Sequence, residues 1–331
     1  MPDAPAFRRP TINTPVPLDA WSDFWSTSRQ GAIDLGADDP VAEALRRHWL
    51  EQVPWLMACN TVVDVGSGPA VLPRLLLGLR PAQLGLLPWV CIDRAHIASG
   101  TDVPATVRLL DGVDFGASAP PVGDALADGI VSNFGIEYVE PATLAVGFAR
   151  WLAPGRRLHA IVHASGSIID QVSASAADDI VWALDEVKLF DAARELLATM
   201  SALPTDPIDR MMHGVNERDA YNAAVNRLKQ RMETRGAVSA PLMDMLNGLR
   251  ALTGLALDGS SEQALAALAA RRVALRGEIQ RLHAMKRCAL DAERLQALSQ
   301  ALATAGIAAD PVTCVDCALG SVAWVVSGRR T

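Results

Sequence analysis

Short apolar runs alternate with longer segments of helical periodicity along the first half of this chain. Five of the runs have the length of strands, and they cover residues 61–65, 88–93, 105–111, 128–134 and 157–164. The first run, TVVDV, is continuously apolar up to its acid, which is typical of a strand buried on both faces of a sheet. A strand–helix–strand rhythm of this kind predicts an α/β fold with a parallel, doubly wound sheet.

The rhythm stops after the fifth run. The following residues contain almost no strand-like run and are rich in alanine, leucine and arginine, so we expect a large helical insertion. Strand patterns return near the end of the sequence as a hairpin around Gly320, so the insertion precedes the last two strands. The predicted organisation is a flexible N-terminal lead-in (1–20), a core (21–168 and 305–331) and a helical insertion (169–304) that forms a lid or an oligomer contact.

Charge and cysteine content exclude several classes of protein. The formal net charge is −7 and no basic run is present, so a nucleic-acid partner is not expected. The five cysteines are an odd number, and the Cys314–Cys317 pair lacks a second pair, so we predict neither a disulfide framework nor a metal site. No secretory signal is visible, and no apolar stretch reaches the ~18 residues needed to span a bilayer. We therefore expect a cytoplasmic protein without a membrane span.

A glycine loop follows the first predicted strand, in the sequence TVVDVGSGPA at residues 61–70. Gly66 and Gly68 match the start of a dinucleotide fingerprint, but Val71 stands where the third glycine should be. Asp64, two residues before the first glycine, would repel a diphosphate. A carboxylate at this place suits a cationic ligand, with an ammonium or a sulfonium group.

S-adenosylmethionine carries both of these positive charges and no phosphate. Asp93 ends the second strand, where a carboxylate accepts hydrogen bonds from both ribose hydroxyls. Asp114 follows the third strand, where an adenine amino group would lie.

Five motifs together resemble the class I S-adenosylmethionine-dependent methyltransferases of the small-molecule type (types 11 and 25). They are VVDVGSGPA, VCIDRA, DGVDFG, DGIVSNFGIEYV and LAPGRRLHAIVHA, and they follow the order and spacing of the family over about residues 60–165. One departure is Ala70, where the family usually has a third glycine. The resemblance implies a Rossmann-like, seven-stranded sheet whose last strand is antiparallel.

The resemblance also implies a set of cofactor contacts. Residues of the glycine loop should face the methionine and ribose, Asp93 the ribose, and the residues after the third and fourth strands the adenine and the methionine end. The cofactor residues implied in this way are Asp64, Gly66, Ser67, Gly68, Asp93, Arg94, Asp114, Phe115, Asn133 and Phe134. The implied cofactor is S-adenosylmethionine, with S-adenosylhomocysteine as the product.

Methyl transfer needs alignment and exclusion of water, and a base only if the acceptor must lose a proton. His163 ends the fifth strand and is the candidate catalytic base; alternatively, it bonds the turn that follows. Glu137 and Tyr138 either line the acceptor site or simply begin a helix. His213 in the insertion is a weaker candidate for the acceptor site, and Trp25 either covers the cofactor or packs in the core.

The predicted function is therefore methyl transfer from S-adenosylmethionine to a small-molecule acceptor, with oxygen, nitrogen and carbon acceptors left open. The size of the insertion favours an apolar or bulky acceptor, and the same insertion offers a surface for a homodimer. Two alternatives remain: a non-catalytic protein that binds S-adenosylmethionine, and an oxidoreductase that uses another nucleotide.

Overall fold

The computed structural model describes residues 18–28, 31, 33–98, 103–120, 126–200, 213–235 and 239–331. Most of the predicted lead-in, residues 1–17, lies outside these ranges. Within them, no helix combines the length and the apolar character needed to cross a bilayer.

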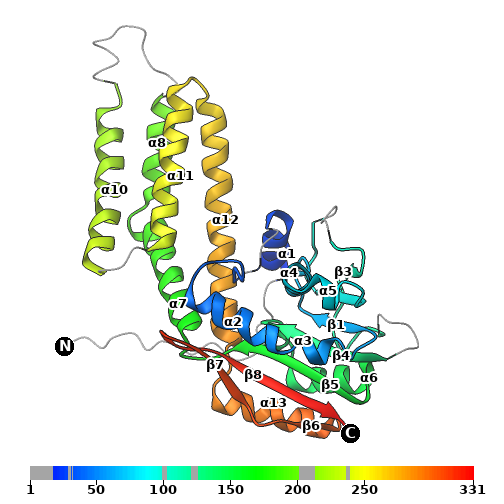
Figure 1. Cartoon of the computed structure of the whole chain (residues 1–331). Helices are drawn as coiled ribbons and strands as arrows, with labels where there is room; N and C mark the ends of the chain where they lie inside the picture. Colours follow the sequence, from blue (N-terminus) through cyan, green and yellow to red (C-terminus); the bar gives the residue numbers. More distant parts are fainter. Residues whose placement is uncertain are drawn as a thin grey trace, which may run out of the picture.

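A single mixed sheet lies at the centre of the sheet domain (Figure 1). Its strands are β1 (Val62–Val65), β2 (Trp89–Ile92), β3 (Val107–Leu110), β4 (Ala127–Asn133), β5 (Leu152–His163), β6 (Ile307–Ala309), β7 (Thr313–Cys317) and β8 (Gly320–Arg330). The first five strands are parallel in the order β3-β2-β1-β4-β5, and β8 pairs antiparallel with β5. The predicted α/β fold, a Rossmann-like doubly wound sheet with an antiparallel last strand, is confirmed.

The strand beside β8 is divided into two pieces. β6 pairs with residues 328–330 of β8, and β7 pairs with residues 320–325, while β5 occupies the other side of β8. The two pieces therefore fill one position of a seven-position sheet, with Pro311 between them. The predicted hairpin around Gly320 is present, whereas β6 was not predicted, because three residues give no periodic signal.

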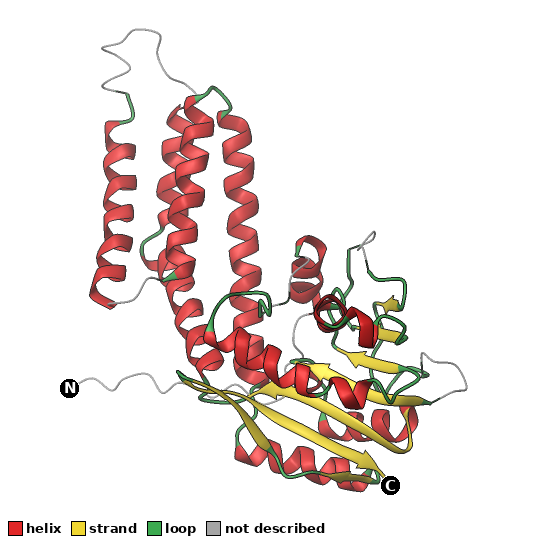
Figure 2. Cartoon of the chain, in the orientation of Figure 1, coloured by secondary structure: helices red, strands yellow, loops and turns green. Residues whose placement is uncertain are grey.

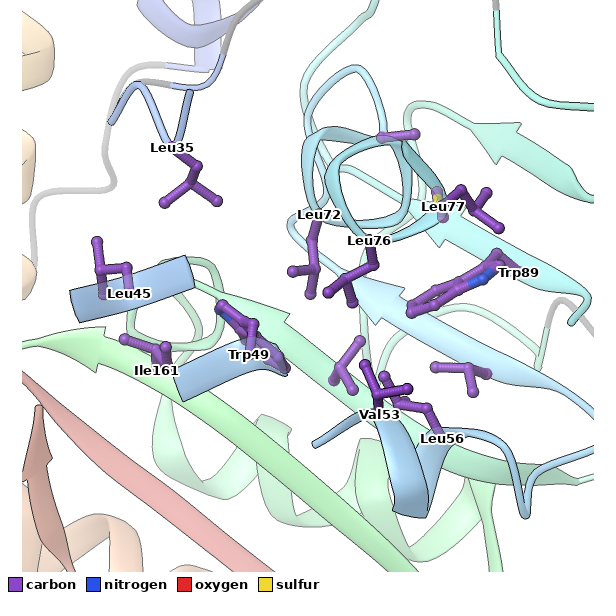
Figure 3. Close-up of a cluster of buried hydrophobic side chains, with 14 of the residues drawn as sticks. Leu35, Leu45, Trp49, Val53, Leu56, Leu72, Leu76, Leu77, Trp89 and Ile161 are labelled. Carbon is purple, nitrogen blue, oxygen red and sulfur yellow. The ribbon is translucent and has the colours of Figure 1, made fainter. Parts of the chain in front are cut away.

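Helices cover both faces of the sheet. On one face lie α2 (Pro40–Glu51), α3 (Val53–Leu56), α4 (Val71–Leu79) and α5 (Pro81–Leu84), and on the other α6 (Pro141–Trp151) and α13 (Ala292–Thr304). Figure 3 shows the first core, in which Trp49, Leu72 and Trp89 meet between helices and strands. Asp39 caps α2 by accepting hydrogen bonds from the amides of Val41 and Ala42, as its position before Pro40 predicts.

The remaining long helices form a bundle that stands away from the sheet (Figure 2). They are α7 (Ile168–Val181), which continues through a π-helical segment (Trp182–Glu186), then α8 (Leu189–Met200), α10 (Val215–Arg235), α11 (Ala240–Leu257) and α12 (Ser261–Cys288). The bundle has its own buried core, with Leu197, Leu228 and Leu249 at its centre. α13 falls within the predicted insertion but packs beside α6, in the core under the sheet.

Candidate functional site

The glycine loop joins β1 to α4 at the carboxyl end of the sheet. Gly66 lies directly against Gly135, since a side-chain carbon on Gly66 would come within 2.7 Å of the Gly135 Cα. Gly135 precedes the 3₁₀ turn Ile136–Tyr138 that follows β4. Only glycine allows the two backbones to approach so closely, which ties the loop after β1 to the end of β4.

A small cavity of about 50 Å³ lies at the carboxyl ends of β1, β4 and β5. Its polar wall comes from Asp64, Ser67, Asn133 and His163, and its apolar wall includes Trp21, Trp25, Ile33 and Phe134. The structure thus brings together most of the predicted cofactor residues and the candidate base. Carboxyl ends of strands are where open α/β sheets bind ligands.

Asp64 is the most unusual polar group in this cavity. Its side chain is 1% exposed, and neither carboxylate oxygen finds a hydrogen-bond partner among the described residues. Burial, with a smaller contribution from the charge of Asp93, raises the pKa of Asp64 well above its usual value. A buried carboxylate without donors is costly, so the site suits a ligand that brings hydrogen-bond donors or positive charge.

Asp93 holds the loop in shape. Its two oxygens accept hydrogen bonds from the amides of Gly68 and Ala95, both at 2.8 Å. Burial raises its pKa to about 6, although these amide hydrogen bonds oppose the rise. Each oxygen keeps a second lone pair, so the predicted contact with a ribose remains compatible with this geometry.

Asn133 and Phe134 end β4 at the cavity. The Asn133 side-chain oxygen accepts a hydrogen bond from the indole of Trp49 at 2.8 Å, which fixes its orientation. Trp49 was missed as a site residue because its helical spacing marks it only as core. Phe134 has a left-handed backbone (φ 61°), and its ring stacks on His163 with centroids 4.5 Å apart.

Glu137 lies next to His163. A Glu137 oxygen accepts a hydrogen bond from the His163 amide at 3.0 Å and lies 3.8 Å from the imidazole Nε2. Burial raises the pKa of Glu137 to about 7 and lowers the pKa of His163 to about 4. Tyr138 touches both His163 and Trp21 edge-on, and its hydroxyl has no partner among the described residues.

Three features define the fold. They are the strand order of the sheet, the antiparallel strand β8 and the glycine loop that follows β1. The chain has the class I methyltransferase fold. The resemblance seen in the sequence is therefore confirmed at the level of the fold. Among the residues that the structure describes, no cluster of side chains could hold a metal ion.

Comparisons with known proteins give structural matches only, since no family model and no curated protein matches this chain. The N-methyltransferase NodS from Bradyrhizobium japonicum WM9, solved with S-adenosyl-L-homocysteine, is 17% identical with a TM-score of 0.33, covering 43% of this chain and 73% of its own. Magnesium protoporphyrin IX methyltransferase from Synechocystis PCC 6803, also with this product, is 8% identical with a TM-score of 0.40, covering 95% and 93%. The plantazolicin methyltransferase BpumL is 12% identical with a TM-score of 0.32, covering 42% and 52%. The chain spans 63% of the length of a further methyltransferase, from a Haloferax volcanii complex.

Besides Asp93, Glu137 and Tyr138, which are described above, four more predicted residues do not line the cavity. The Phe115 ring is 2% exposed and packs on Phe148 and Trp151 in the second core, so only its backbone could reach a ligand. Arg94 is exposed and Asp114 is half-buried, and neither lines the cavity. His213 contacts the Thr199 carbonyl in the helical bundle, and it too is absent from the cavity wall.

The helix α1 (Leu18–Thr27) covers the glycine loop of the methyltransferase fold. The Trp25 ring rests on Gly68, where a side-chain carbon would come within 2.8 Å of it. The Arg281 guanidinium from α12 lies 3.8 Å from the ring centroid of Phe24 in α1. The helical insertion therefore reaches the site through α1. The sequence did not predict this contact, because nothing along the chain marks Arg281 as a neighbour of α1.

Proposed function

We propose that this chain is an S-adenosylmethionine-dependent methyltransferase that acts on a small-molecule acceptor. The observation that carries the proposal is Asp64, a buried carboxylate without donors that faces the cavity beside the glycine loop. The substrate S-adenosylmethionine would supply a methyl carbon bonded to a positively charged sulfur.

Residues of the cavity and of the loop beside it have roles in this proposal. Asp64 would accept hydrogen bonds from the ammonium group, and Asp93 from the ribose hydroxyls. Asn133, oriented by Trp49, would bind the methionine end. The rings of Trp25 and Phe134 would lie beside the sulfonium, to which aromatic faces are attracted, and would exclude water from the transfer.

The helical insertion has a proposed role as a cover for the acceptor side of this site. Its α12 contacts α1, and α1 lies over the loop. An apolar acceptor of some bulk would suit the aromatic wall. A non-catalytic binding protein of the same fold remains the alternative.

Titration calorimetry with S-adenosylmethionine and S-adenosylhomocysteine tests the proposal. We expect Asp64→Asn to weaken binding by about 1.5–3 kcal/mol, or roughly ten- to hundredfold, because it removes a buried charge–ammonium contact. Asp316→Asn, on an exposed position of β7, is the matched control and should bind like the parent. Tighter binding of a nicotinamide dinucleotide, or equal affinity in the two variants, would overturn the assignment. Tight binding without turnover across an acceptor panel would favour the non-catalytic alternative.

A further inference from the structure

Glu137 is buried beside the candidate base His163, and only one of its two carboxylate oxygens accepts a hydrogen bond from a described residue. Its side chain is 0% exposed, and Oε1 accepts the amide hydrogen bond of His163. Oε2 has no hydrogen-bond partner among the described residues. Packing gives no reason for a buried acid with an orphaned oxygen in the turn after β4, so a functional reason is sought.

The imidazole of His163 links this acid to the cavity. One side of the ring stacks on Phe134 and the ring lines the cavity, while Nε2 lies 3.8 Å from Glu137 Oε1. A small shift would bring these two atoms within hydrogen-bond distance. The arrangement is that of a base with an acid behind it, in which the acid orients the imidazole and stabilises its protonated form.

Other charged groups near the pair come from three elements. Asp170 of α7 acts on His163, but it also accepts a hydrogen bond from Lys286 of α12. The Cys288 thiol at the end of α12 and the Tyr138 hydroxyl lie near Glu137 and do not ionise at neutral pH, since burial raises the pKa of Cys288 to about 12 and that of Tyr138 well above its usual value. Glu137 is therefore the partner of His163 that titrates near neutrality.

We infer that Glu137 is a positioning residue that makes His163 a competent base, and that the acceptor is an uncharged molecule with a hydroxyl group on an apolar skeleton. The inference rests on the proposed function. In the step, the hydroxyl proton passes to the His163 imidazole as the oxygen bonds to the methyl carbon. The carbon–sulfur bond breaks and its electron pair stays on sulfur, giving S-adenosylhomocysteine. The imidazolium faces the Glu137 carboxylate and then releases its proton to water.

The cavity wall supports this class of acceptor. Apart from Asp64 and His163, its lining residues carry no ionisable side chain, and most of the wall is ring or aliphatic carbon. No lysine or arginine is among the described residues of the wall, so none of them could pair with an acceptor carboxylate.

The protonation behaviour of the pair follows from the geometry and the surroundings. Burial, opposed in part by the charge of Asp170, lowers the pKa of His163 to about 4, and burial, opposed in part by backbone hydrogen bonds, raises the pKa of Glu137 to about 7. Two groups so close titrate as a unit. The active form, neutral His163 with ionised Glu137, accumulates as pH rises through about 7.

The test is an NMR titration of the His163 imidazole in the full chain with S-adenosylhomocysteine present, with the signal assigned through His163→Asn. In the parent protein we expect a response centred near pH 7, where Glu137 ionises. In Glu137→Gln, which keeps the amide hydrogen bond, that response should vanish and leave only a step near pH 4. Identical titration curves in the two proteins would overturn the positioning role.

The acceptor class is tested with two probes of one shape, 2-naphthol and 2-naphthoate. We expect 2-naphthol to shift the His163 signal in the complex and 2-naphthoate to leave it unchanged. Equal effects, or a larger effect of the carboxylate, would overturn the hydroxyl assignment. Calorimetry with S-adenosylmethionine separates this inference from the proposed function. If Glu137→Gln still binds S-adenosylmethionine but the His163 titration is unchanged, only the positioning role of Glu137 is refuted. If the parent protein does not bind S-adenosylmethionine, the proposed function is refuted.

Discussion

Two histidines, His48 and His159, pair between α2 and β5. His48 of α2 and His159 of β5 approach with their Nε2 atoms 2.9 Å apart, so one ring must donate and the other accept. His159 is 2% exposed, and its Nδ1 has no partner among the described residues. Burial, with smaller contributions from His48 and Arg157, lowers the pKa of His159 to about 3. The folded state therefore needs a neutral His159.

We predict that this pair costs stability as the solution is acidified. Between the unfolded pKa of 6.5 and the folded pKa of about 3, the unfolded chain binds a proton that the folded chain does not. The free energy of unfolding should thus fall as pH drops from 6.5, by up to about 1.4 kcal/mol per pH unit. Urea unfolding at pH 7, 6, 5 and 4 should give a shallower decline for His159→Gln than for the parent. The exposed His96→Gln is the control, and a parent-like decline in His159→Gln would refute the assignment.

The candidate site was partly visible at the residue scale, and the visible part has a physical reason. Asp64, Asn133 and His163 end strands, so the rule that parallel strands end together places them at one cavity. Arg281 and Trp49 come from helices whose orientation no local pattern specifies. Phe115 was misplaced because a residue after a strand can point into either face of the sheet, and its apolar ring is buried in the core.

At the scale of single elements, α1 controls the room available for a ligand. The cavity of about 50 Å³ is well below the roughly 300–1,000 Å³ of sites for small molecules. Trp25 occupies the space over Gly68, so we expect α1 to shift when a ligand of the size of S-adenosylmethionine enters. Arg281 of α12 contacts the rings of Phe24 and Trp21 in α1.

We predict that Arg281→Gln loosens α1. Loss of a buried cation–ring contact of about 0.5–2 kcal/mol should speed hydrogen exchange in the amides of α1 and raise the association rate of S-adenosylmethionine. Arg272→Gln, on the same helix but paired with Asp191, serves as the control and should change neither. If α1 amides exchange alike in the two variants, Arg281 does not hold the helix.

Elements with a long periodic signal could be predicted, and short ones could not. The five parallel strands are apolar runs, and α12 and α13 arise from a long amphipathic stretch that ends before Gly306. β6 has only three residues, and its extended conformation depends on pairing with β8, which follows it in the sequence. The same tertiary contacts place α13 under the sheet rather than in the bundle.

At the scale of the whole molecule, most of the helical bundle stands apart from the sheet (Figure 1), and the bundle has a buried core of its own. Leu249 of α11 is 1% exposed. We predict that Leu249→Ala leaves a cavity in the core of the bundle and destabilises the bundle by about 2–5 kcal/mol. Hydrogen exchange should accelerate in α10 and α11 and stay slow in β4 and β5. Leu257→Ala on the same helix is the control, because its side chain is 70% exposed. Equal loss of protection in the strands would mean that bundle and sheet unfold as one unit.

The divided strand beside β8 has a consequence for the behaviour of concentrated solutions. Sheets with long, regular borders can recruit strands from other molecules and aggregate. One border of this sheet is the four-residue β3, and the other is interrupted at Pro311, which cannot donate a backbone hydrogen bond. Neither border offers a template long enough to propagate intermolecular β-structure. Self-association of the folded chain, including the predicted homodimer, is therefore expected to proceed through its helices.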